Sequence, residues 1–156
     1  MHDIFDLLLN AREISPSTTA MVRAYCDRWK LSGYHGLLRT HIFTEEELAD
    51  LLSGLLKMDR VFAISADSTG EEARKALTYK LCMEWECLPC LRDERSRQIE
   101  IIITDPTQRQ RVAYFRDIFS NEISLAVGAR SDVISGINHH FDVSDQLSFL
   151  KGDFGG

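Results

Sequence analysis

The first sixty residues place their apolar side chains at the spacing of helices. Ser15 and Pro16 suit the N-cap and the first position of a helix, and apolar residues then recur on one predicted inner face. The residues of that face are Met21, Val22, Tyr25, Cys26 and Trp29. Thr44 begins another helix, with a capping box that Glu47 completes. Its apolar stripe is Leu48, Leu51, Leu52, Leu55 and Leu56.

A short predicted helix precedes each of these longer ones, over residues 3–10 and 34–40. The two halves of this region match at an offset of 29, which pairs Phe5, Leu8, Leu9, Ile14 and Ser15 with Tyr34, Leu37, Leu38, Phe43 and Thr44. One interpretation is a tandem helical repeat, and the other is two ordinary helical hairpins that share a pattern.

The second half of the chain mixes helices with strands. Residues 61–64 form a short extended run, and residues 65–70 are small and polar, as in a linker. A helix is predicted over 71–81, and strands are predicted over 86–91, 99–103 and 123–127. Asp105-Pro106 and Ser131-Asp132 each look like a helix start.

The pattern therefore predicts an α+β protein with a helical subdomain and a small α/β subdomain that contains a three-stranded sheet. The predicted boundaries are 1–64 for the helical part, 65–70 for the linker, 71–142 for the α/β part and 143–156 for a polar, glycine-containing tail.

Composition narrows the class of function. The 156 residues carry a net charge of -6, which disfavours bulk electrostatic binding to nucleic acid. No apolar run approaches the ~20 residues of a membrane span, and no signal peptide is recognisable. We therefore expect a cytoplasmic protein that does not insert into a membrane.

The sequence lacks the motifs of common catalysis. It has no phosphate loop, no H-E-x-x-H and no G-x-S-x-G, so we expect no enzyme activity and no cofactor or metal. Cys87 and Cys90 form a C-x-x-C, which is either a redox pair or half a zinc site, or else a pair of buried apolar thiols.

Arginines gather in the second half, and Arg109 and Arg116 lie seven apart on one predicted helix. They are either a solvated surface or a docking site for an acidic partner, because arginine binds carboxylates in a bidentate manner. Leu51 and Leu55 belong mostly to a core, yet a stripe of that length also suits a partner helix or strand.

The order of segments in the second half resembles the N-terminal domain of type II secretion and type IV pilus assembly ATPases. A Cys-Leu-Pro-Cys strand precedes a hydrophobic strand that runs into Thr104-Asp105-Pro106-Thr107, and His140-Phe141 stands where the family has His-Tyr. The resemblance covers about residues 71–142. The family's tandem helical units, with a period near 29 or 30, are similar to the N-terminal half.

This resemblance implies a non-catalytic docking or regulatory domain that binds the cytoplasmic part of an inner-membrane platform protein. It would thus lie at the membrane only through that partner. The ATPase motor motifs are absent from this chain, so the motor belongs either to a longer form of the chain or to another protein.

Some members of the family bind cyclic di-GMP through the helical units, which implies an alternative function as a nucleotide sensor. The corresponding site would include Leu8, Arg12, Leu37 and His41. The sequence departs from the family there. Arg12 and His41 replace glycines, Cys26 and Leu55 replace the closing glutamines, and the opening Arg-Leu-Gly triplets are Asp3-Ile4-Phe5 and Ser32-Gly33-Tyr34.

Overall fold

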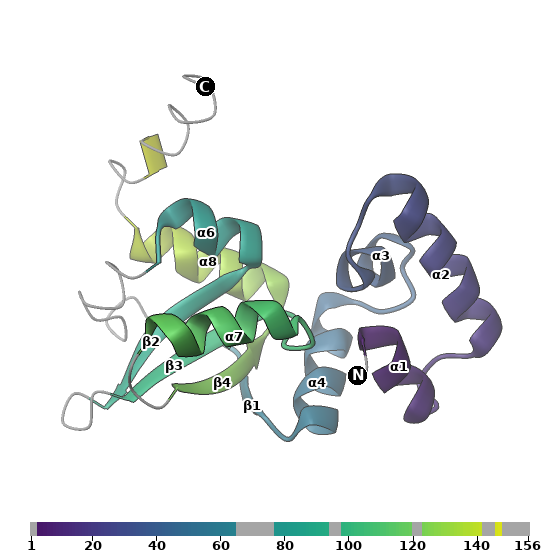
Figure 1. Ribbon diagram of the computed structural model, residues 1–156, viewed down its shortest axis with the longest axis horizontal. Coiled ribbons are helices and arrows are strands. Elements are labelled where there is room, and N and C mark those ends of the chain that lie inside the picture. Colours follow the sequence, from purple (N-terminus) through teal and green to yellow (C-terminus); the bar gives the residue numbers. More distant parts are fainter. Residues whose placement is uncertain (1–2, 65–76, 94–97, 120–122, 142–145, 148–156) are drawn as a thin grey trace.

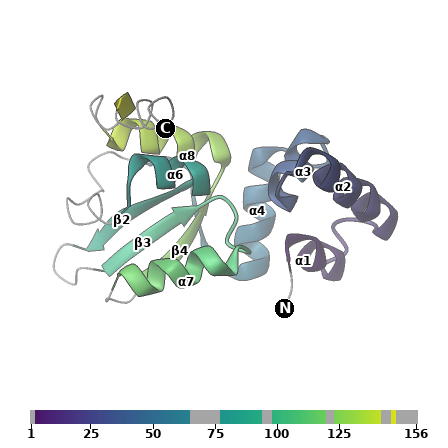
Figure 2. The same cartoon turned by 45° about the horizontal axis from the view of Figure 1, so that its top comes forward.

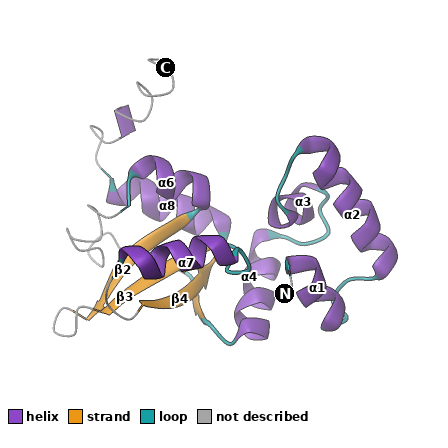
Figure 3. Ribbon diagram, viewed as in Figure 1, coloured by secondary structure: helices purple, strands orange, loops and turns teal. Residues whose placement is uncertain are grey.

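The computed structural model describes residues 3–64, 77–93, 98–119, 123–141 and 146–147. Within these residues the chain forms a helical part and a four-stranded sheet flanked by helices, which confirms the predicted α+β class (Figure 1). Figure 3 shows that the strands are confined to one half of the molecule.

The helical part consists of two short helices that alternate with two longer ones. In chain order they are α1 (Ile4–Asn10), α2 (Pro16–Trp29), α3 (Gly33–Arg39) and α4 (Glu45–Leu56). Each begins at a polar residue whose side chain accepts a hydrogen bond from the third backbone amide of its helix, and these N-caps are Asp3, Ser15, Ser32 and Thr44. The starts predicted at Ser15 and Thr44 are thereby confirmed.

The two helical units also turn in the same way. Arg12 and His41, which stand 29 residues apart, both adopt the left-handed conformation, with φ of 59° and 60°. Their amides donate to Leu9 and Leu38 at 3.0 and 3.1 Å. The offset found in the sequence is therefore repeated in the backbone, which favours a tandem repeat over two unrelated hairpins.

The predicted inner face of α2 is only partly correct. Val22 and Cys26 are buried, but Met21 and Trp29 are 66% and 55% exposed. The spacing of apolar residues shows which side of a helix is apolar. It does not show how much of that side is covered by other helices. Here α3 packs against only one part of that side, where Gly36 leaves room for the Cys26 thiol.

The sheet contains one strand more than the sequence predicts. Its order is β1 (Asp59–Val61), β4 (Ile123–Gly128), β3 (Gln98–Ile103) and β2 (Cys87–Asp93). The additional strand is β1, which pairs in parallel with β4, whereas β3 pairs in parallel with β4 and antiparallel with β2. β1 lies within residues 1–64, which the sequence assigns to the helical part, and it overlaps the predicted extended run of 61–64 only at Val61.

Three helices cover the sheet. Two of them, α6 (Tyr79–Trp85) and α8 (Arg130–His140), lie on one face, and α7 (Arg109–Ile118) lies on the other (Figure 2). One apolar cluster lies around the sheet and a second lies among α1–α4. The second cluster includes Val127 from β4 and Ala129, which follows that strand, so the helical part packs directly onto the sheet.

Two predicted helix starts are wrong. Asp105-Pro106 forms a turn in which the Asp105 carboxylate accepts from the Thr107 amide at 3.0 Å, and α7 begins later, at Arg109. The last helix begins at Arg130, before Ser131-Asp132, and has no side-chain N-cap of its own. In the first case the Asx turn satisfies the local amide before a helix can form.

The predicted linker at 65–70, residues 71–76 of the predicted helix over 71–81, and most of the 143–156 tail lie outside the described residues. In the described remainder of that helix, α6 starts at Tyr79, one residue after its N-cap Thr78.

Candidate functional site

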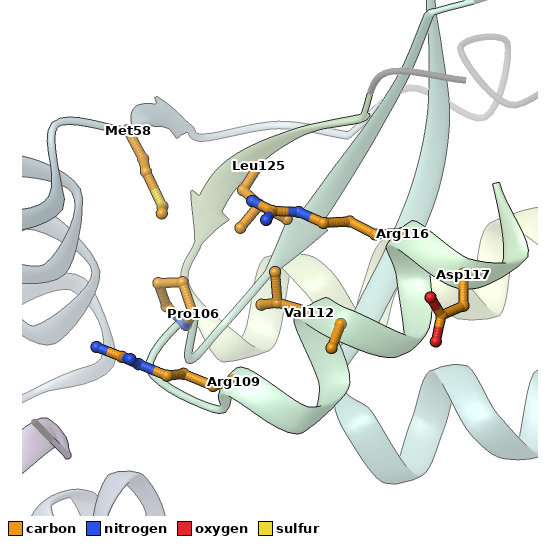
Figure 4. A pocket seen from close by; sticks show the side chains of 8 residues that line it. Met58, Pro106, Arg109, Val112, Arg116, Asp117 and Leu125 are labelled. Carbon is orange, nitrogen blue, oxygen red and sulfur yellow. The ribbon is translucent and has the colours of Figure 1, made fainter. Parts of the chain in front are cut away.

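A groove lies between α7 and the middle of β4. Its volume is about 480 Å³. Its lining is mostly apolar, with one arginine from α7 at each end. The lining residues are Met58, Pro106, Arg109, Val112, Ala113, Arg116, Asp117 and Leu125. Figure 4 shows the side chains of Met58, Val112 and Leu125 directed into the groove, while those of Arg109 and Arg116 extend from opposite ends of α7.

Arg109 and Arg116, predicted from their spacing to share a helix face, do line the same groove. Both are exposed. The ion pairs of the described residues engage the arginines Arg23, Arg60 and Arg130, and neither groove arginine takes part in one. An apolar floor with an exposed guanidinium at each end is suited to a ligand that combines apolar surface with carboxylates.

Leu51 and Leu55, predicted with these arginines as partner-binding residues, lie elsewhere. Both are partly buried against the apolar cluster of the helical part, and neither lines the groove. Met58, which follows α4, is the residue from this region that does reach it. The sequence offers no sign of this, because a single methionine after a helix has no distinctive pattern.

A cluster of polar side chains around Glu86 joins the helical part to the sheet. Glu86 is buried, and its carboxylate accepts from Arg130 Nε at 2.8 Å and from Thr104 Oγ1 at 3.1 Å. His35 Nε2, from α3, lies 2.9 Å from the same carboxylate. Burial raises the pKa of Glu86, but the hydrogen bonds and charges of His35 and Arg130 outweigh burial and leave the pKa below its usual value.

Two further groups belong to this joint. Glu45, in the first turn of α4, accepts from the amide of Ser131 at 3.0 Å and so caps α8 from another part of the chain. The buried Tyr34 hydroxyl has no hydrogen-bond partner within the described residues. Burial raises its pKa, and the nearby carboxylates of Glu86 and Glu45 raise it further. The joint is therefore an ionic connection between two packed halves.

The C-x-x-C pair does not have the geometry of a redox or zinc pair. Cys87 and Cys90 are three apart in β2, and side chains at that spacing point to opposite faces of a sheet. A hydrogen bond with Cys82 and burial raise the pKa of the Cys87 thiol well above its usual range. All four cysteines are buried, so the structure favours the interpretation as apolar thiols.

The residues of the alternative nucleotide site separate into two kinds. Leu8 and Leu37 are completely buried, whereas Arg12 and His41 are exposed at the left-handed turns. Arg12 also lines a surface hollow of about 470 Å³ together with Leu9 and Glu13. Glycine at positions 12 and 41 would leave the backbone of each turn accessible, whereas Arg12 and His41 place a side chain there.

Comparison with solved structures places the chain in a known fold. It superposes on the N-terminal domain of XpsE with a TM-score of 0.64 at 18% identity, over 91% of this chain and 99% of that one. A second crystal form of that domain gives 0.58 at 19% identity, over 88% and 94%. A structure of MshE with cdg gives 0.65 at 12% identity, over 90% and 100%.

No protein-family model matches the sequence, and no curated protein matches it. At the identities above, the likeness establishes the fold. The structure therefore confirms the resemblance to secretion ATPase N-terminal domains at the level of architecture, over most of the chain. Among the described helices none is both long and apolar enough to cross a bilayer.

Proposed function

We propose that this chain is a non-catalytic docking domain of a secretion or pilus assembly ATPase, and that it binds the cytoplasmic part of an inner-membrane platform protein. The observation that carries the proposal is the fold, which matches nearly the whole N-terminal domain of XpsE. The lack of a phosphate loop in the sequence agrees with a role that does not include nucleotide hydrolysis.

The α7 groove supports a docking role. Its arginines are exposed and make no ion pair with the described residues, although the chain as a whole is acidic. Charged groups at the rim of an apolar groove direct a partner of opposite charge and fix its register. The domain would then work at the cytoplasmic face of the inner membrane, where the partner holds it.

The test is association with the cytoplasmic domain of the platform protein from the same secretion or pilus system. Both proteins would be purified separately, mixed, and followed by sedimentation velocity and calorimetry. We expect a saturable complex with a Kd in the micromolar range, typical of a transient docking interaction. Failure to associate at high micromolar concentration of both proteins would contradict the proposal.

A second candidate function is the sensing of cyclic di-GMP. It is favoured by the likeness to the MshE structure with cdg and by the two helical units with equivalent turns. Under this hypothesis Arg12 and His41, which are exposed, lie at the nucleotide, whereas Leu8 and Leu37 are completely buried and do not reach it. Calorimetry with cyclic di-GMP would give a saturable heat at tens of micromolar ligand. A flat titration at that concentration would eliminate the candidate.

A further inference from the structure

The α7 groove has charged ends and an apolar middle. Arg109 and Arg116 are seven residues apart in one helix, so their Cα atoms are about 10.5 Å apart along its axis. Between them α7 contributes Val112 and Ala113 to the lining, and Leu125 contributes from β4. A ligand that fits must therefore place an anion near each end of α7, with apolar surface between the two anions.

The charge of α7 is opposite to that of the protein. The chain has a net charge of -6, whereas α7 contains three arginines and one acid, Asp117. Arg111 lies over the Trp85 ring at 5.6 Å and belongs to another side of the helix. This leaves Arg109 and Arg116 as the cationic groups of the groove, and the chemistry they select is a pair of carboxylates.

The spacing discriminates between a helical and an extended ligand. Carboxylates seven apart on a helix lie about 10.5 Å apart on one face, with positions i+3 and i+4 between them on the same face. On an extended strand, same-face residues are about 7 or 13 Å apart, so no pair repeats the Cα spacing of about 10.5 Å between the two arginines. The α7 arginines therefore match a helix packed alongside α7.

We propose that the α7 groove binds an acidic amphipathic helix of a partner protein. That helix presents two carboxylates seven residues apart to Arg109 and Arg116, and apolar side chains between them to Val112 and Leu125. Asp117, which follows Arg116 in α7, disfavours a further carboxylate at that end of the groove. The inference rests on the proposed docking function and specifies the form of the segment that docks.

The experiment uses the full chain and a designed helical peptide of 14 residues as the probe. The peptide carries two glutamates seven apart, leucines at i+3 and i+4 between them, and a fluorophore at one end. A second peptide has the same composition with the glutamates five apart, which places them on different faces. Fluorescence anisotropy at low salt reports both affinities, and we expect at least tenfold tighter binding of the in-phase peptide.

Charge reversal provides the specific control. In the Arg109→Glu/Arg116→Glu variant we expect at least tenfold weaker binding of the glutamate peptide, and recovery with a peptide that carries lysines instead. Lys80→Glu, an exposed charge reversal on α6 across the sheet, should leave the affinity unchanged. Circular dichroism should show the same fold in both variants, because the replaced side chains are exposed.

Three results would overturn the inference: no binding of the in-phase peptide at millimolar concentration, equal binding of both peptides, or equal loss in the Lys80→Glu variant. The docking function is tested separately with the platform domain. If that domain still binds the double variant with unchanged affinity, docking stands and the groove is not its site. If it binds neither protein, docking itself fails.

Discussion

Glu86 lies at the joint between the two halves, and its replacement should destabilise the protein. Its carboxylate is 7% exposed and holds Arg130 at 2.8 Å and His35 at 2.9 Å. Glu86→Gln keeps the shape and one acceptor oxygen but removes the charge. Matched Glu84→Gln, on the exposed side of α6, removes an equal charge without touching the joint.

The magnitude follows from the partners. A hydrogen bond to a charged group contributes about 1.5–3 kcal/mol in net stability. His35 and Arg130 are 36% and 41% exposed, so water compensates part of the loss. We therefore expect Glu86→Gln to lower the free energy of unfolding by about 2 kcal/mol. For a chain of this size that corresponds to roughly 4–8 °C in Tm.

The loss should also depend on pH. The pKa of Glu86 is lowered in the folded protein, so its contribution is present above the unfolded pKa. It disappears as the pH falls through the lower, folded pKa. Urea titrations would show the difference between wild type and Glu86→Gln at pH 6, and it should shrink below about pH 4. A difference no larger than that of Glu84→Gln, or one that is constant down to pH 3, would refute the ionic account of the joint.

Further predictions concern packing, backbone and thiols. Gly36→Ala should lower stability by about 1–3 kcal/mol in urea denaturation, because the new methyl group overlaps Cys26 Sγ; an unchanged midpoint would show that α2 and α3 are not packed this closely. Lys57→Gly should raise the free energy of unfolding by about 0.5–1 kcal/mol, since Lys57 ends α4 at a φ of 54°; a loss would mean that its side chain stabilises the helix end. Ellman's reagent should leave Cys87 and the other thiols unmodified until urea unfolds the protein, and fast labelling without denaturant would contradict their burial.

Local patterns predicted what local chemistry determines. The N-caps at Ser15 and Thr44 were predictable, because a capping side chain and the amide it serves are only three residues apart. The offset of 29 left two interpretations open, a tandem repeat and two ordinary hairpins, and the equivalent left-handed turns at Arg12 and His41 favour the repeat. The start of α7 was not predictable, since Asp105 suits a helix cap and an Asx turn equally well by sequence.

Contacts between distant residues left no pattern to interpret. The bonds from Arg130 to Glu86 and from Ser131 to Glu45 span 44 and 86 residues. Both bonds form because α8 follows β4 and begins next to the helical part. No periodicity in the sequence indicates that proximity. The groove combines a local and a distant contribution. Its arginines share one helix and were predicted together, whereas Met58 lies in the groove only because of the tertiary fold.

Calorimetric titration of this chain with the cytoplasmic domain of the platform protein tests whether the two proteins dock. We expect a saturable one-to-one isotherm with a Kd in the micromolar range, and binding that weakens as salt rises, because the interface is charged. A flat isotherm with both proteins folded and at high micromolar concentration would contradict it.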